Sequence, residues 1–182
     1  DAIELNLSCP NVKEGGIHFG RSAETISRLL SELRLITEKP LWAKLSPQVT
    51  DIVELGTAAA DSGAYAIVVI NTLPAMAIDI ETKKPRLGAI TGGLSGSAIH
   101  PVAVAMIYAL HNAVDIPIIG VGGISSTEDA IELMLAGATA LQIGSSAFAD
   151  TNLPLKIIDG IGKYCRRQGF SSAREIVGAV EI

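Results

Sequence analysis

Short apolar runs alternate with longer amphipathic stretches along this chain. Five runs predict strands, at residues 2–8, 41–45, 66–70, 116–120 and 140–143. The run 66–70 has no polar residue, which is typical of a strand buried on both faces in a parallel sheet. Between the runs, apolar residues recur at helical spacing. In residues 22–36 this spacing places five side chains on one face of a predicted helix: Ile26, Leu29, Leu30, Leu33 and Ile36.

Residues typical of helix ends stand between the predicted strands. The candidate N-terminal caps are Ser22, Thr50 or Asp51, Ser126 with Asp129 three residues later, and Ser172 before a short last helix. Pro101 suits the first position of a further helix, because its fixed backbone angle matches the helix and the missing N–H is not needed there. The glycines that end helices by this interpretation are Gly63, Gly137 and Gly169.

Residues 75–91 interrupt this alternation of strands and helices. The stretches 76–80 and 86–90 flank Glu-Thr-Lys-Lys-Pro and predict a hairpin.

Five strand–helix units indicate an α/β fold with a parallel sheet. A closed (β/α)8 barrel needs eight such units and about 250 residues, so the chain fits either an open sheet or part of a barrel. The first residue, Asp1, is not Met, which favours the second. We therefore expect residues 1–182 to be a single incomplete TIM-barrel domain: the C-terminal portion, about five of eight units, with a small β-hairpin insertion.

Composition and charge narrow the class of protein. The net charge is −5, and the densest basic cluster is Arg166-Arg167, so we expect no nucleic-acid partner. No apolar run approaches the roughly 18–20 residues of a membrane span, and no signal segment begins the chain. The 2 cysteines, Cys9 and Cys165, form neither a disulfide framework nor a cysteine-rich metal site. We expect a cytoplasmic protein.

Polar residues gather where the predicted strands end, which is where ligands bind in α/β folds. These residues are Asn6, Cys9 and Asn11 near the first strand, Lys44 in the second, and Asn71 and Thr72 after the third. A cysteine thiolate can act as a base or nucleophile, although a lone cysteine is more often a small buried apolar residue. An inward-facing Lys44 needs an anionic partner or a solvated cleft; the alternative is an exposed lysine at a strand edge.

Glycine loops follow the last two strands, at residues 120–123 and 144–146. Such loops often bind phosphate in barrels, because glycine lets backbone N–H groups approach the anion. The alternative is that they are only sharp turns between strand and helix. The three histidines show no spacing that suits a metal site or a catalytic triad, so we interpret them as surface or structural residues: His18, His100 and His111.

Seven motifs carry a family resemblance: Asn6-Leu-Ser-Cys-Pro-Asn11, Lys44-Leu-Ser-Pro47, Ile70-Asn-Thr-Leu73, Met76-Ala-Ile-Asp-Ile-Glu-Thr82, Thr91-Gly-Gly-Leu-Ser-Gly96, Ile119-Gly-Val-Gly-Gly-Ile124 and Gln142-Ile-Gly-Ser145. In this order they resemble class 1 dihydroorotate dehydrogenases, and specifically the FMN-containing catalytic subunit of the NAD-linked type 1B enzymes. The resemblance covers essentially the whole chain.

The resemblance implies an oxidoreductase of pyrimidine (UMP) biosynthesis that oxidises (S)-dihydroorotate to orotate. It identifies Cys9 with the base that removes the proton from C5, while hydride passes from C6 to N5 of FMN. Lys44 matches the lysine beside the flavin pyrimidine edge, where its charge would stabilise the reduced ring. The implied cofactor-binding residues are Asn6, Lys44, Ile70, Gly96, Gly122, Gly123, Gly144 and Ser145. The implied substrate-binding residues are Asn6, Asn11, Asn71 and Thr72.

Type 1B enzymes pair with an electron-transfer subunit that carries FAD and a [2Fe–2S] cluster and passes electrons to NAD. Such a cluster needs about four cysteines, so it would belong to the partner, in a heterotetramer built on a homodimer of catalytic subunits. The chain departs from the family at Pro74 and at Ser145, where Thr is common, and it lacks the family's first three strands. Two alternatives therefore stay open: a phosphate-binding barrel without redox activity, and an inactive truncated fragment.

Overall fold

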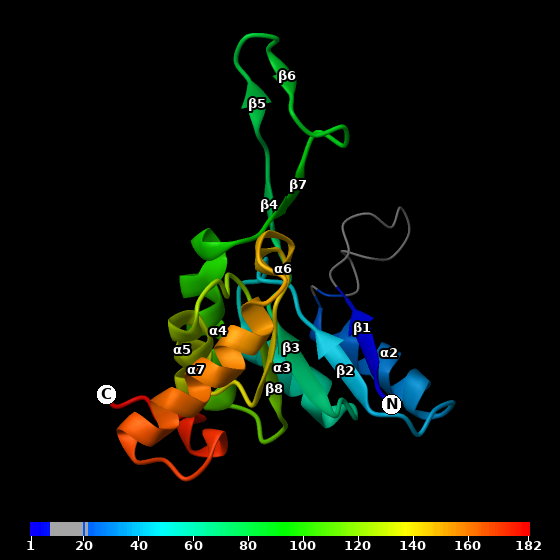
Figure 1. The fold of residues 1–182 in the computed structure, drawn as a ribbon. Coiled ribbons are helices and arrows are strands. Elements are labelled where there is room, and N and C mark those ends of the chain that lie inside the picture. Colours follow the sequence, from blue (N-terminus) through cyan, green and yellow to red (C-terminus); the bar gives the residue numbers. More distant parts are fainter. Residues whose placement is uncertain (8–19, 21) are drawn as a thin grey trace.

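The five predicted strands form one parallel sheet. The computed structural model describes residues 1–7, 20 and 22–182. The strands lie side by side in the order β1 (Ile3–Asn6), β2 (Leu41–Lys44), β3 (Ala66–Val69), β8 (Ile118–Val121) and β9 (Ala140–Gln142) (Figure 1). Each neighbouring pair is parallel. The prediction of an α/β fold with a parallel sheet is confirmed, whereas the fraction of a barrel that it represents stays a prediction.

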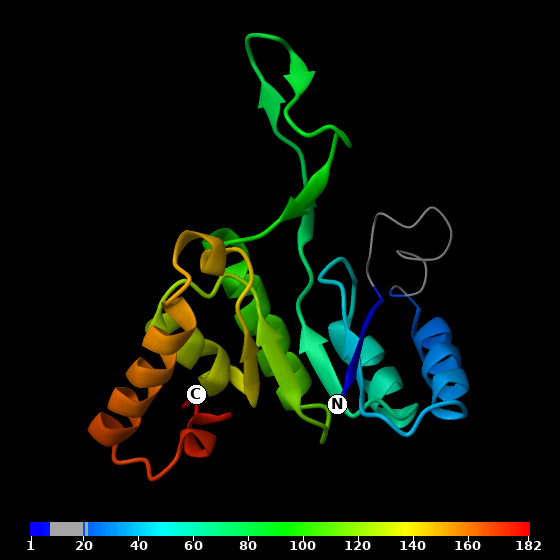
Figure 2. The ribbon, with the colours of Figure 1, turned by 45° about the vertical axis from the view of Figure 1, so that its right-hand side comes forward.

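Helices cover one face of this sheet. They are α2 (Ala23–Arg34), α3 (Ile52–Asp61), α4 (His100–His111), α5 (Thr127–Ala136) and α7 (Leu153–Gln168), with the short α6 (Ser146–Ala149) before α7. Successive helices contact one another, with α2 and α7 at opposite ends of the row (Figure 2). The main core lies between the sheet and these helices, where Ile67 and Ile118 belong to one buried cluster with Leu30, Ile107 and Leu133.

The other face of the sheet is concave. Trp42, Ala66, Val68 and Ile119 form a second apolar cluster there. Farther along the strands, the Gln142 Nε2 amide on β9 donates a hydrogen bond of 2.6 Å to Glu4 on β1. Since β1 and β9 are the two edges of the sheet, this contact requires the sheet to curl until its edges approach each other.

Between β3 and α4 the chain leaves the sheet. Strand β4 (Leu73–Ala75) pairs with β7 (Gly92–Leu94), and β5 (Ile78–Asp79) pairs with β6 (Lys84–Pro85), both antiparallel. The two pairs project away from the parallel sheet (Figure 1). The strand pairings are shorter than the predicted stretches, and residues 86–90 form no strand. That this arm is an insertion into a barrel stays a prediction.

Several predicted helix ends are confirmed. Ser22 accepts a hydrogen bond from Thr25 N, and Asp51 rather than Thr50 accepts from Val53 N and Glu54 N. Ser126 and Asp129 form a reciprocal capping box at the start of α5. At the other end of their helices, Gly137 caps α5 and Gly169 caps α7. The local sequence therefore specifies where most of these helices begin and end.

Four details of the prediction are wrong. Helix α2 ends at Arg34, so Ile36 leaves the apolar face and is exposed. Pro101 is the second residue of α4, because the short 3-10 helix Ser97–Ile99 runs directly into His100. Ser172 precedes the 3-10 helix Ala173–Ile176 without a side-chain capping bond. Strand β8 begins at Ile118 rather than 116, since Pro117 has no N–H to donate to a neighbouring strand.

Among the described residues, no helix has both the length and the apolar character needed to cross a bilayer.

Two leucines near the end of α2 test how much of the fold depends on the core. Leu30 is fully buried, whereas Leu35 is 86 % exposed just beyond the helix. We expect Leu30→Ala to lower the free energy of unfolding by about 2–5 kcal/mol, because it leaves a cavity in the main core. The matched change Leu35→Ala should alter it by less than about 0.5 kcal/mol. Urea denaturation measures both, and equal effects would contradict this assignment of the core.

Candidate functional site

A hollow of about 310 Å³ lies where the parallel strands end. It is bounded by the ends of β2, β3, β8 and β9 and by the loops that follow them. Nine of the residues predicted for cofactor or substrate binding line it: Lys44, Ile70, Asn71, Thr72, Gly96, Gly122, Gly123, Gly144 and Ser145. A tenth, Asn6, hydrogen-bonds to one of them. The predicted Cys9 and Asn11 lie outside the described residues, and so does His18.

Lys44 points onto the concave face of the sheet and is held there by two partners. Its Nζ lies 2.9 Å from Glu4 Oε1 and donates a longer bond of 3.4 Å to Gln142 Oε1. The side chains of Lys44 and Glu4 are only 19 % and 26 % exposed. The structure thus places the lysine inward beside an anionic partner, and the alternative of an exposed edge lysine is wrong.

Glu4 and Gln142 belong to this site although sequence reasoning did not single them out. Strand register offers a signal for Glu4. Glu4 pairs with Trp42, two residues before Lys44 on β2, so Glu4 and Lys44 lie on the same face of neighbouring strands. An unpaired ammonium on that face would be costly, so a carboxylate on the next strand is the expected partner. No signal of this kind exists for Gln142, since its contact with Glu4 depends on the curvature of the whole sheet.

Amide side chains form the rim beside Lys44. Asn71 Nδ2 donates to Asn6 Oδ1 at 2.9 Å, which links the ends of β1 and β3. Asn71 Oδ1 in turn accepts from Thr72 N at 2.7 Å. These bonds fix the orientation of the Asn71 amide, because its oxygen and nitrogen now have different partners. A rim of oriented amides can recognise a planar ligand that carries both donors and acceptors.

The two glycine loops lie next to each other at this hollow. Gly122 and Gly123 have φ values of +144° and +71°, which other residues rarely adopt. A side chain at Gly123 would also meet the Cβ of His100 at 2.7 Å and the Gly96 carbonyl oxygen at 2.8 Å. The loop is therefore a sharp turn, as the alternative interpretation held, and it also lines the hollow.

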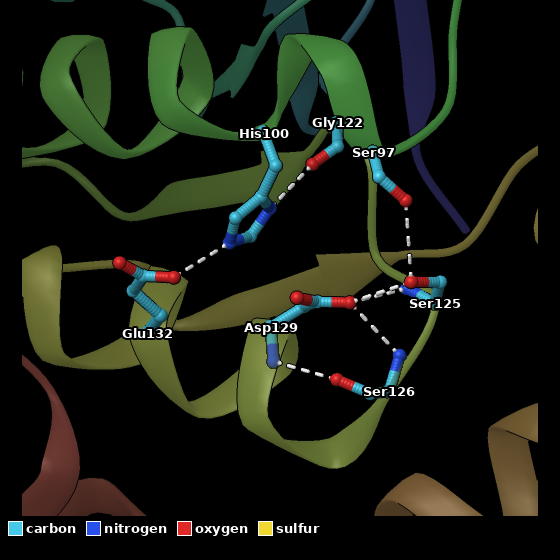
Figure 3. A network of polar contacts seen from close by, with 7 residues as sticks. All are labelled: Ser97, His100, Gly122, Ser125, Ser126, Asp129 and Glu132. Carbon is cyan, nitrogen blue, oxygen red and sulfur yellow. Dashed lines mark hydrogen bonds and ion pairs between the residues drawn. The ribbon is translucent and has the colours of Figure 1, made fainter.

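The first glycine loop is anchored by the start of α5 (Figure 3). The Asp129 carboxylate accepts hydrogen bonds from Ser125 N, Ser125 Oγ and Ser126 N, at 2.8–2.9 Å. Partial burial acts to raise the pKa of Asp129. The bonds from Ser125 and Ser126, together with the positive charge of His100, outweigh that effect and leave the pKa below its ordinary value. This network fixes the chain directly after the loop.

Of the three histidines, the structure buries His100 and leaves His111 exposed. The interpretation of His100 as a structural residue is therefore favoured over a surface one.

Among the described residues, no group of three or more His, Cys, Asp or Glu side chains could hold a metal ion. Cys165 lies in a buried cluster with Ile131, Met134 and Ile176, and it does not line the hollow at the strand ends.

A larger hollow, of about 670 Å³, lies between α5 and α7. None of the predicted residues lines it. Its charged residues include Lys163 and Asp159, which pair with each other along α7 at 2.6 Å. The smaller hollow, which nine of the predicted residues line, is therefore the better candidate site.

Comparison with known proteins gives one family. The sequence profile described as dihydroorotate dehydrogenase matches residues 1–164. Curated relatives share about half of their residues with this chain. One from Bacteroides thetaiotaomicron is 51 % identical over 181 residues, and one from Caldicellulosiruptor bescii is 50 % identical over 182 residues. Both are named dihydroorotate dehydrogenase B (NAD(+)), catalytic subunit. The alignments cover all of this chain but only 60 % and 61 % of those proteins.

The Asp129 network makes a prediction about pH. Because the folded state lowers the pKa of Asp129, the carboxylate stabilises the protein above its unfolded pKa of about 3.9, and this stability is lost as the pH falls. Asp129→Asn should lower the free energy of unfolding at neutral pH by about 1 kcal/mol, the cost of a lost cap. Denaturation at a series of pH values should show the difference shrinking below pH of about 4. A difference that is constant with pH would contradict this role of the charge.

Proposed function

This chain belongs to the dihydroorotate dehydrogenase family, and from that membership we propose that its protein oxidises (S)-dihydroorotate to orotate with FMN as the hydride acceptor. This reaction is a step of de novo pyrimidine biosynthesis. The observation that carries the proposal is the meeting of nine motif residues at one hollow, although they come from five separate stretches of the chain. The chain spans about 60 % of the length of its relatives. The activity is therefore proposed for the whole protein, in which these residues would form part of the active site.

The described residues suit the two ends of FMN. At one end, the loops after β8 and β9 line the hollow with Gly122, Gly123, Gly144 and Ser145, and backbone N–H groups with a hydroxyl are typical phosphate ligands. At the other end, Lys44 brings a positive charge to the ends of the strands. We propose that Ile70 and Gly96 contact the flavin between these ends through their backbones, and that Asn6 touches both flavin and substrate.

In the proposed mechanism, FMN when bound supplies a two-electron acceptor, and the chain supplies orientation and proton transfer. Lys44 is held in place by Glu4 and Gln142, so its charge is already positioned where negative charge would develop on reduction. Asn71, whose amide is oriented by Asn6 and Thr72, would bind the pyrimidine ring with Thr72 and Asn11. Cys9 would take the proton from C5, which is only weakly acidic and needs a positioned base.

The names of the relatives support one further part of the proposal. Each relative is called a catalytic subunit, and we propose a separate electron-transfer subunit that carries FAD and the [2Fe–2S] cluster. We also propose a homodimer of catalytic subunits within the heterotetramer, and a cytoplasmic location. The curled parallel sheet supports an origin as about five of the eight units of a TIM barrel, with the β4–β7 arm as an insertion.

Gly123 tests FMN binding. We expect Gly123→Ala to weaken FMN binding by at least about tenfold, because a side chain at this φ would strain the loop and collide with His100 and Gly96. Flavin fluorescence quenching measures the dissociation constant. Gly88→Ala is the matched control, since a Cβ at Gly88 meets nothing within 4 Å. If both variants bind FMN as the unchanged protein does, the glycine loop is not the phosphate site. If the unchanged protein binds no FMN, the proposed function fails.

Cys9 tests the chemistry separately from binding. Cys9→Ala should leave FMN binding unchanged and slow flavin reduction by dihydroorotate about 100-fold or more, the usual contribution of a general base. Stopped-flow absorbance under anaerobic conditions follows the reduction. Cys165→Ala is the control, because Cys165 is buried in a different cluster. Normal reduction in the Cys9 variant would exclude this thiol as the base, and FMN binding without any reduction in the unchanged protein would favour a phosphate-binding protein without redox activity.

A further inference from the structure

His100 is a buried, titratable side chain for which the proposed mechanism has no role. It is the first residue of α4, and its side chain is only 8 % exposed. It does not line the hollow. It instead lies behind the first glycine loop, between that loop and α5 (Figure 3). His100 thus lies directly behind Gly122 and Gly123, two residues of the proposed phosphate site.

Both ring nitrogens of His100 face oxygen acceptors. Nδ1 lies 2.9 Å from the Gly122 carbonyl oxygen, and Nε2 lies 3.0 Å from Glu132 Oε2 on α5. The Gly122 carbonyl oxygen can only accept, so Nδ1 carries a hydrogen and donates it. With Nε2 against Glu132, the ring bridges the glycine loop and α5.

The bond to Gly122 determines which way the next peptide faces. Within the described residues, the only cis peptide bond joins Val69 and Ile70, so the Gly122–Gly123 bond is trans. In a planar trans peptide, the C=O and N–H groups point in opposite directions. The Gly122 carbonyl points to His100, which does not line the hollow, so the Gly123 N–H faces the opposite way from His100. No described residue accepts a hydrogen bond from that N–H.

We propose that His100 is a positioning residue, which through its Nδ1–H holds the Gly122–Gly123 peptide with its N–H toward the hollow, and that this orientation selects a ligand with a phosphate group. The proposal rests on the proposed function only for the identity of the ligand as FMN. Without the bridge the peptide could turn over and present its carbonyl oxygen to the anion, which would repel it.

A purely structural histidine makes a different prediction from a positioning one. Loss of packing alone would weaken the binding of FMN and of riboflavin, which lacks the phosphate, by the same factor. Loss of the peptide orientation would weaken the binding of FMN far more than that of riboflavin. The ratio of the two dissociation constants therefore isolates the effect at the phosphate end, and a general loss of stability does not change it.

We expect His100→Leu to reduce the preference for FMN over riboflavin about tenfold, the effect of a lost hydrogen bond to a charged group. His100→Asn should keep most of the preference, because the Asn amide nitrogen can occupy the place of Nδ1 and donate to Gly122. Glu132→Gln should lower the preference, and Glu128→Gln, an exposed residue on the same helix, should not. Fluorescence titrations with both flavins give each ratio.

Nitrogen-15 NMR of the histidine ring provides a second readout that needs no ligand. We expect Nδ1 of His100 to carry a hydrogen, as its bond to the Gly122 carbonyl requires. An Nδ1 without a hydrogen in the unchanged protein would overturn the proposal, and so would a wild-type FMN preference in a folded His100→Leu variant. If that variant does not fold, the Glu132→Gln ratio decides: a lowered ratio supports the proposal, and an unchanged one overturns it.

Failure of the proposed function would be visible separately. If the unchanged protein binds neither flavin, that function fails, and inorganic phosphate becomes the probe for His100. A phosphate-dependent shift of the Gly123 amide signal that is lost in Glu132→Gln would still support the positioning role. The absence of such a shift in the unchanged protein would overturn it.

Discussion

Side chains from the first and last strands of the parallel sheet meet on its concave face, and this closure determines where the polar groups of the site lie. Glu4 on β1 bonds to Gln142 on β9, and both hold Lys44 on β2. A flat sheet of five strands would keep its edges too far apart for this contact, because neighbouring strands are about 4.8 Å apart. The curvature therefore brings residues separated by most of the chain length around one ammonium group.

The energetics of burial explain why this cluster has three members. A lysine that is 19 % exposed loses most of its hydration, and an attraction to one carboxylate offsets that loss only if the remaining hydrogens find acceptors. Glu4 supplies the charge and Gln142 supplies a further oxygen. At the other end of the hollow, the first glycine loop is also held from behind, because His100 bonds to the Gly122 carbonyl and Asp129 bonds to Ser125 directly after the loop. The hollow is thus bounded by groups whose orientations are already fixed.

Much of this arrangement could be predicted from the sequence, because local patterns specify it. The apolar run at β3 predicted a buried parallel strand, and Ser126 with Asp129 predicted the start of α5. Alternation along the strands and the position of loops predicted which residues reach the strand ends. The role of Gln142 could not be predicted, since it depends on curvature, and neither could that of His100, whose partners come from a loop and from another helix. Long-range contacts of this kind leave no periodic signal in the sequence.

A crystal structure of the protein with bound FMN would test the central claim most directly, namely that the strand ends and the two glycine loops form one flavin site. The account predicts the phosphate against Gly122, Gly123, Gly144 and Ser145, and the pyrimidine edge of the flavin beside Lys44. Density for FMN in the larger hollow between α5 and α7, or across the projecting β4–β7 arm, would contradict it. So would a flavin at the strand ends whose phosphate lies away from both loops.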